Sequence, residues 1–198
     1  MSVAEETLAL EAGDAPAAAA RPRGISNVAT LFLVTADFMV LAGLVAGYYG
    51  VRSQSFNWPP VGLGTYLPTM VALTIVMTVI TVQWAIWSIR RDDQRTCLAA
   101  LGVTIFFALA ILNAQWYGLA HLNFGVGAHT YGTFVYILTA FHMANVIAAI
   151  VVLVAVLART IGGEFSADDH DTLTAAAVFW QFCNVAGLVV FAVLYLHP

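Results

Sequence analysis

Four polar side chains lie in the middle of long apolar segments: Asp37, His142, Asn145 and Asn184. A polar or ionisable side chain at membrane depth is costly and needs a partner, so it marks either a contact between helices or a functional site. The surrounding chain is 61% hydrophobic and only 9% charged over 198 residues. This composition predicts a polytopic membrane protein and excludes an ordinary soluble domain.

The spacing of these residues places them in pairs. His142 and Asn145 are three residues apart, which puts them on one face of a helix, and Gln181 and Asn184 repeat that spacing. Two interpretations remain open for both pairs. The side chains either hydrogen-bond between neighbouring helices, at about 0.6 kcal/mol for each bond, or form a lipid-headgroup, proton or ligand site.

Asp37 is an acidic residue near the centre of the first apolar segment. A carboxylate is costly to ionise at that depth, so Asp37 is either a proton-linked group or a structural carboxyl that is protonated or hydrogen-bonded to a neighbouring helix. Gly43 and Gly47 follow on the same segment as a GxxxG pair. Such a pair is typical of a surface where two membrane helices pack closely.

Motifs for catalysis or metal binding are missing from the sequence. His142 is the only mid-membrane histidine, so the chain lacks the facing pairs that haem ligation requires, and it lacks ligands for copper or zinc. We expect no catalytic residue, no metal and no cofactor in this chain.

Cys97 and Cys183 fall at different depths and should stay unpaired. The run 168–171 is acidic and should be a loop, with Asp171 or Thr172 capping the last helix.

Hydropathy and length predict an all-α fold with five transmembrane helices. About 20 apolar residues are needed to cross a bilayer as a helix, and turn or charge signals separate the segments that qualify. The predicted spans are 26–50, 67–89, 97–119, 131–158 and 173–196. Residues 25–198 should therefore form one five-helix domain.

The arginines predict the orientation of this bundle. The chain has no lysine, and with five alternating spans all arginines but Arg52 fall on one side. The positive-inside rule then places the N-terminus in the cytoplasm and the C-terminus outside. Residues 1–24 are rich in Ala, Pro and acidic residues and should be a disordered cytoplasmic tail rather than a cleaved signal peptide.

From about residue 27 onward the chain resembles subunit III of the haem-copper terminal oxidases. The resemblance rests on several short motifs in the correct order, each weak alone. Thr35-Ala-Asp37-Phe-Met is similar to the family's Ser-Glu-x-Met-Phe, and Trp58-Pro59-Pro60 matches its Trp-Pro-Pro loop. The later motifs are Gln115-Trp-Tyr117, Tyr131-Gly132-Thr-Phe, Thr139-Ala-Phe141-His142 and Phe179-Trp180-Gln181-Phe182-Cys-Asn184-Val185.

The resemblance implies a non-catalytic accessory subunit of a cytochrome c oxidase in the cytoplasmic (inner) membrane of a bacterium. Such a subunit packs against catalytic subunit I, binds phospholipid in a cleft, and assists oxygen or proton supply. Haem and copper then belong to partner subunits. Trp58, Phe141 and Trp180 are the lipid-cleft candidates. The resemblance leaves open a paralogue associated with nitric oxide reductase, and a stand-alone transporter is the alternative from another class.

The chain departs from the family's motifs in one consistent way, because neutral or small residues stand where the family has ionisable or large ones. Gly118 stands in place of a Glu, Asn145 in place of a His, and Gly187 in place of a Trp. Gln181 and Asn184 stand in place of a His and an Asp. Among the departing positions only Asp37 keeps a titratable group, one methylene shorter than the family's Glu. We therefore expect hydrogen bonding to persist where titration does not.

Overall fold

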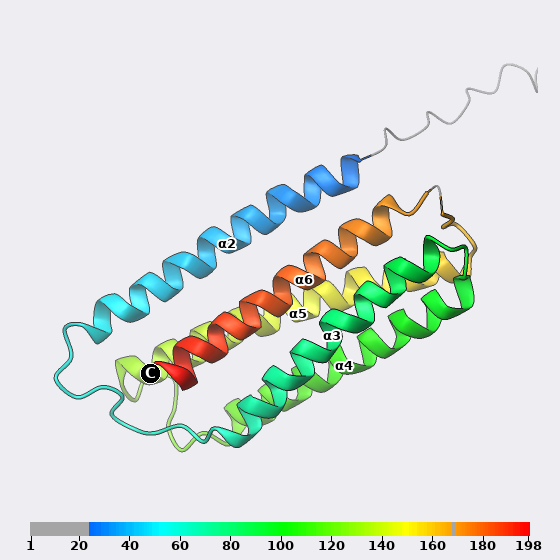
Figure 1. Ribbon diagram of the computed structural model, residues 1–198. Coiled ribbons are helices and arrows are strands. Elements are labelled where there is room, and N and C mark those ends of the chain that lie inside the picture. Colours follow the sequence, from blue (N-terminus) through cyan, green and yellow to red (C-terminus); the bar gives the residue numbers. More distant parts are fainter. Residues whose placement is uncertain (1–23, 168) are drawn as a thin grey trace, which may run out of the picture.

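The computed structural model describes residues 24–167 and 169–198 and consists of five long helices in that part of the chain (Figure 1). Each is long and apolar enough to cross a membrane, which confirms the predicted all-α, five-span fold. The predicted tail, residues 1–24, lies outside the described residues except for Gly24. The helices are α2 (Ile25–Arg52), α3 (Tyr66–Ile89), α4 (Gln94–Ala120), α5 (Thr130–Ile161) and α6 (Asp171–Phe191), which η1 (Ala192–Leu196) extends as a wider π-helical turn.

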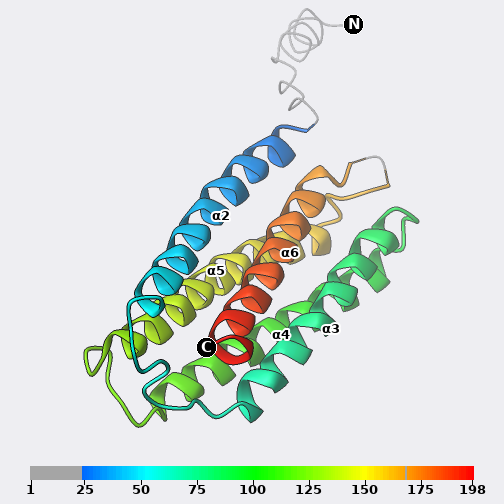
Figure 2. The same cartoon turned by 60° about the vertical axis from the view of Figure 1, so that its left-hand side comes forward.

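Helix α6 lies at the centre of the bundle. It contacts α2, α3 and α5, whereas α4 packs on α3 and α5 and makes no comparable contact with α2 (Figures 1 and 2). More of α6 is buried than of any other described helix, and α2 is the least buried. The bundle is thus a four-helix core of α3 to α6 with α2 laid against one side.

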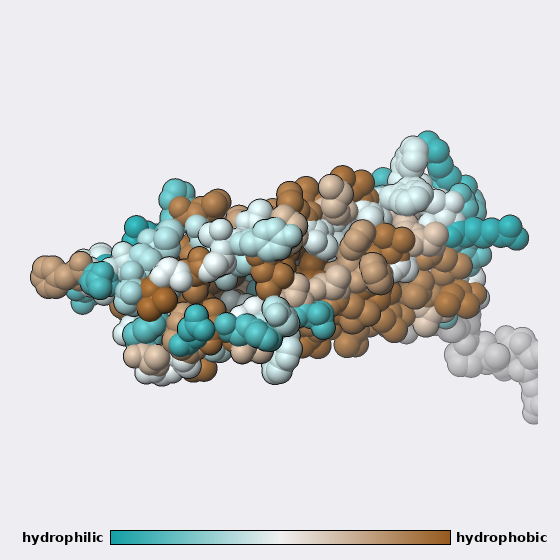
Figure 3. Space-filling model, turned by 90° about the horizontal axis from the view of Figure 1, so that it is seen from below, coloured by the Kyte–Doolittle hydropathy of each residue, from teal (hydrophilic) through white to brown (hydrophobic). Residues whose placement is uncertain are grey.

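The core has two main clusters, one near each end of the bundle. We call the end with loops 53–65 and 121–129 the outer end, following the arginine-based prediction, and the other the inner end. The inner cluster contains Trp180 and Leu153, and the outer cluster contains Tyr48 and Leu138. Apolar side chains also cover the middle of the surface seen in Figure 3, with hydrophilic ones toward both ends. This distribution suits a helix bundle surrounded by lipid.

Hydrogen bonds to aspartates join the loops at the inner end. Asp93 caps α4, and the hydroxyl and backbone N–H of Thr96 lower the pKa of its carboxyl by donating to it. Asp92 adopts a left-handed backbone conformation with φ of 56° and accepts a hydrogen bond from the backbone N–H of Ala167 at 2.7 Å. The short loop 90–93 is therefore held against the loop that precedes α6.

The predicted cap of the last helix is wrong. The residue at the cap position is His170, whose side chain makes no capping bond, and Asp171 is the first helical residue. Asp171 instead accepts a hydrogen bond from the backbone N–H of Gly24 at 2.8 Å, which links the start of α6 to the start of α2. Its charge still suits the positive end of the helix dipole. Asp168, at the start of the acidic run, lies outside the described residues.

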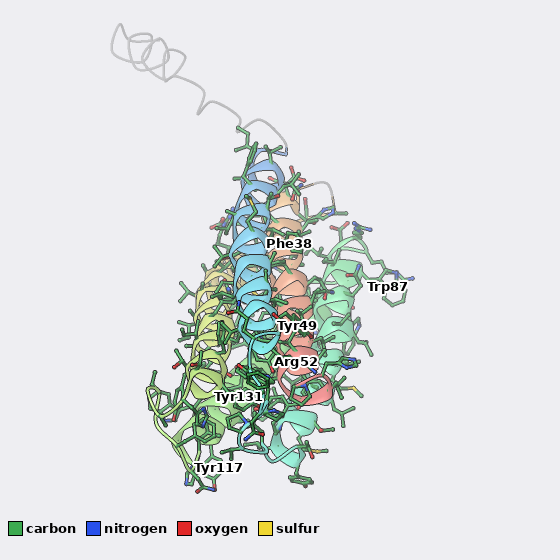
Figure 4. The ribbon with its side chains drawn as sticks, turned by 90° about the vertical axis from the view of Figure 1, so that its left-hand side faces the viewer. Phe38, Tyr49, Arg52, Trp87, Tyr117 and Tyr131 are labelled. Carbon is green, nitrogen blue, oxygen red and sulfur yellow. The ribbon has the colours of Figure 1, made fainter. Side chains whose placement is uncertain are left out.

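Aromatic and cationic side chains gather near the ends of the bundle. Figure 4 shows Tyr117, Tyr131 and Arg52 toward the outer end and Trp87 nearer the inner one. The guanidinium of Arg91 lies 3.6 Å from the centre of the Trp87 ring, a cation–π contact. These positions agree with aromatic belts at two membrane interfaces.

Cys97 and Cys183 are both buried and unpaired, which confirms that they form no disulfide.

Candidate functional site

His142 joins three helices near the middle of the bundle. It lies on α5 with 1% of its surface exposed, and its Nε2 is 3.2 Å from the backbone carbonyl oxygen of Cys183 on α6. A carbonyl oxygen only accepts, so Nε2 carries the hydrogen and donates it. Nδ1 faces the side-chain amide of Gln115 on α4, 2.8 Å from its Nε2 and 3.0 Å from its Oε1, and in a neutral ring it accepts from that Nε2. The imidazole therefore connects α4, α5 and α6.

Gly187 makes room for this imidazole. A Cβ built on Gly187 would lie 2.5 Å from Nε2 of His142 and 2.8 Å from Cδ1 of Ile75. Both distances are far below van der Waals contact, and both neighbours are held in the packed interior. Any larger residue at position 187 must displace the histidine ring, so the position of His142 depends on Gly187.

A second set of hydrogen bonds joins α6 to α3. The Thr78 hydroxyl donates to Oδ1 of Asn184 at 3.0 Å, and Nε2 of Gln181 donates to the backbone carbonyl of Val79 at 3.2 Å. The two amides also contact each other, with Nδ2 of Asn184 3.4 Å from Oε1 of Gln181. The predicted spacing thus brings Gln181 and Asn184 together, and both bond across the helix interface.

Asn145 is buried beside His142 on α5 but has different partners. Its Nδ2 donates to the backbone carbonyl of Phe141 in its own helix at 3.3 Å. Its backbone carbonyl lies 3.7 Å from Sγ of Cys183, which makes a weak contact with α6. His142 and Asn145 therefore share a buried face without sharing a hydrogen bond.

Asp37 is separate from these hydrogen-bonded groups. It lies on α2 about 18 Å along the helix axis from Ile25 and about 22 Å from Arg52, and its side chain is only partly buried. Its carboxyl makes no hydrogen bond within residues 24–167 and 169–198, and it does not bond to His142. Leu41, one turn further along α2, is buried, so Asp37 lies toward the side of the helix that packs on the core.

The predicted glycine stripe on α2 is not a close contact between helices within the described chain. A Cβ on Gly43 would meet nothing within 4 Å, and one on Gly47 would lie 3.6 Å from the Phe134 ring at ordinary contact distance. Both glycines are exposed on the bundle surface. The GxxxG pair stays a prediction for packing against another chain.

The three lipid-cleft candidates separate in the structure. Trp58 and Phe141 are partly buried against the outer core cluster, and the Trp58 indole donates to the Tyr48 hydroxyl at 3.2 Å. Trp180 is 0% exposed within the inner core cluster, because the central helix α6 is covered by its neighbours there. A side chain without exposed surface cannot contact lipid, so the prediction for Trp180 is wrong.

Two residues that form hydrogen bonds inside the core were not predicted from the sequence to do so. Gln115 bonds to His142, and Thr78 bonds to Asn184. Each is a polar residue within a predicted span, which is the signal that singled out their partners. Thr78 is hard to find because threonine satisfies its hydroxyl on its own helix, as Thr78 also does on Ile75.

No group of three or more His, Cys, Asp or Glu side chains within the described chain is arranged to hold a metal ion. The side chains that meet at mid-depth are imidazole, amide and hydroxyl groups, and they bond to one another or to backbone carbonyls. The structure thus defines a class: a multi-pass membrane bundle whose interior polar groups hold its helices together.

Comparisons with known proteins identify the family. A family model described as cytochrome c oxidase subunit III matches residues 12–198. The chain therefore belongs to the cytochrome c oxidase subunit III family, which confirms the resemblance seen in its motifs.

Several curated relatives carry the same name. Cytochrome c oxidase subunit 3 of Synechocystis sp. is 29% identical over 84% of this chain and 72% of its own length. The corresponding protein of Thermostichus vulcanus is 25% identical over 84% of both chains. The probable cytochrome c oxidase subunit 3 of Nocardia farcinica is 28% identical over 88% of this chain and 89% of its own.

The substitution Gly187→Ala should lower the melting temperature of the protein in detergent. The added methyl group has no room beside the His142 ring and must break at least one of its two hydrogen bonds. Gly43→Ala is the matched control on α2, where the methyl group meets nothing and should leave stability unchanged or slightly higher. Equal melting temperatures for Gly187→Ala and the unmodified protein would contradict the close packing.

Proposed function

We propose that this protein is a non-catalytic accessory subunit of a haem-copper cytochrome c oxidase in the cytoplasmic membrane of a bacterium. The match of the subunit III family model to residues 12–198 carries the proposal. Haem and copper would lie in partner subunits, chiefly catalytic subunit I. Five apolar helices and bacterial relatives of the same name support the membrane location.

The exposed face of α2 is our candidate contact with subunit I. This helix is the least buried of the five, and it exposes Phe32, Phe38 and Met39 together with Gly43 and Gly47. A neighbouring helix that packs on the two glycines would cover this apolar surface. Asp37 lies roughly 80–120° around the helix from them, toward the side of α2 that packs on the core, so its carboxyl is not part of this contact.

Phospholipid is the second expected partner. Trp58 and Phe141 are partly exposed beside the outer core cluster, and an acyl chain laid there would cover apolar surface. We propose that lipid bound near these residues helps the accessory subunit to stay attached to the complex. Oxygen or proton supply to subunit I would be an indirect effect of this arrangement.

Affinity purification of the full chain in mild detergent tests the proposal. We expect a large subunit to co-purify, with a reduced-minus-oxidised spectrum that contains a haem a band. A b- or c-type spectrum with a nitric oxide reductase large subunit would instead assign the chain to that paralogous complex. A chain that purifies alone and without haem would overturn the proposal.

Asp37→Asn should leave assembly intact and change the pH dependence of oxidase turnover. Asparagine keeps the size and hydrogen-bonding capacity of the side chain but cannot exchange a proton. The control is Thr35→Val on the same helix, because the Thr35 hydroxyl bonds only to the backbone carbonyl of Leu31. A pH profile identical to that of the unmodified complex would leave Asp37 with a structural role alone.

A further inference from the structure

A partly open cavity of about 230 Å³ lies between the helices of the four-helix core, in its outer half. Its walls come from α3, α4, α5 and α6, and loop residues Leu63 and Gly64 contribute at the outer end. Its inner end reaches Ile75 and Gln115, which adjoin the His142 contact. The cavity opens to the surface beside the exposed residues Tyr117 and His121, and no residue of α2 lines it.

The chemistry of the walls limits what can enter. No Asp, Glu, Lys or Arg lines the cavity in the part of the chain that the structure describes, and most of the lining is aliphatic. The walls offer an ion no permanent opposite charge, with His121 at the open end the one lining side chain that can become a cation, so they favour a neutral ligand. An apolar cavity of 150 Å³ in another protein is known to hold benzene, so 230 Å³ has room for a substituted single ring.

The hydroxyl groups of Thr139 and Tyr195 on the wall make no hydrogen bond within the described residues, and Thr139 is the deeper of the two along its membrane span. Thr139 on α5 lines the cavity with 9% of its surface exposed, and its hydroxyl makes no hydrogen bond within the described residues. Helical threonines usually bond to their own backbone, as Thr160 of the same helix does. Gln115 on the facing wall uses one N–H toward His142 and keeps further bonding capacity. A ligand with a hydroxyl group would satisfy the buried Thr139 hydroxyl.

We propose that this cavity is a binding site for one neutral, single-ring aromatic molecule that carries a hydroxyl group. The ring lies among the aliphatic side chains of the cavity wall, and the hydroxyl exchanges hydrogen bonds with Thr139. This ligand would be additional to the proposed accessory role. The proposal depends on the cavity alone and not on which large subunit accompanies the chain.

Phenol and benzene are the probes that test the site, with the full chain and its accompanying subunits in lipid discs. Equilibrium dialysis should show saturable binding of phenol, about fivefold tighter than that of benzene, because only phenol bonds to Thr139. Thr139→Val keeps the shape of the side chain and should abolish the preference for phenol. Thr35→Val, on the exposed face of α2 and away from the cavity, is the matched control and should retain it.

A second variant tests the cavity rather than the hydroxyl. Ala114→Leu adds volume to the wall and should weaken binding of both probes at least tenfold, whereas Ala110→Leu on the exposed face of α4 should not. Binding that never saturates, or that Ala114→Leu leaves unchanged, would overturn the site. Equal affinity for phenol and benzene would overturn the hydroxyl assignment, and a cavity that holds only ordered water would overturn the ligand.

Discussion

The structure depends on one constraint, that polar groups inside a membrane must find their partners within protein. Helix α6 makes several of the hydrogen bonds that meet this constraint, because its side chains and its backbone both bond to neighbouring helices. The buried indole N–H of Trp180 on the same helix is an exception, without a partner among the described residues. Gln181 and Asn184 bond to α3, and the backbone carbonyl of Cys183 accepts from His142 on α5. His142 in turn accepts from Gln115 on α4. One central helix therefore organises three others, directly or through a single side chain.

Helix α2 differs from the other four, and the difference bears on function. It has few buried residues and exposed glycines, whereas the four-helix core joins His142, Gln181 and Asn184 to neighbouring helices. A packed core with one largely exposed helix is what we expect of a subunit that binds a partner through that helix. The family membership agrees with this division, because a subunit III is by name part of a larger enzyme.

The number and type of helices could be predicted from the sequence, since long apolar segments leave few alternatives. Their ends could not, because α4 begins at Gln94 through the Asp93 cap and α5 continues to Ile161 beyond its last strongly apolar run. The sequence identified the important polar residues but not their partners. Partners depend on the rotation and register of neighbouring helices, and the spacing of residues within one helix gives no information about either. Trp180 shows the same limit, because only the packing order of the helices places α6 at the centre.

The central claim is that hydrogen bonds to α6 hold the core together, and a double-mutant cycle tests it most directly. Thr78→Val and Asn184→Leu each remove one partner of the bond between α3 and α6, and the pair removes both. We expect a coupling free energy of about 0.6 kcal/mol or more in the stability of the detergent-solubilised protein. Strictly additive effects of the two substitutions would show that this bond adds nothing to stability and would contradict the account.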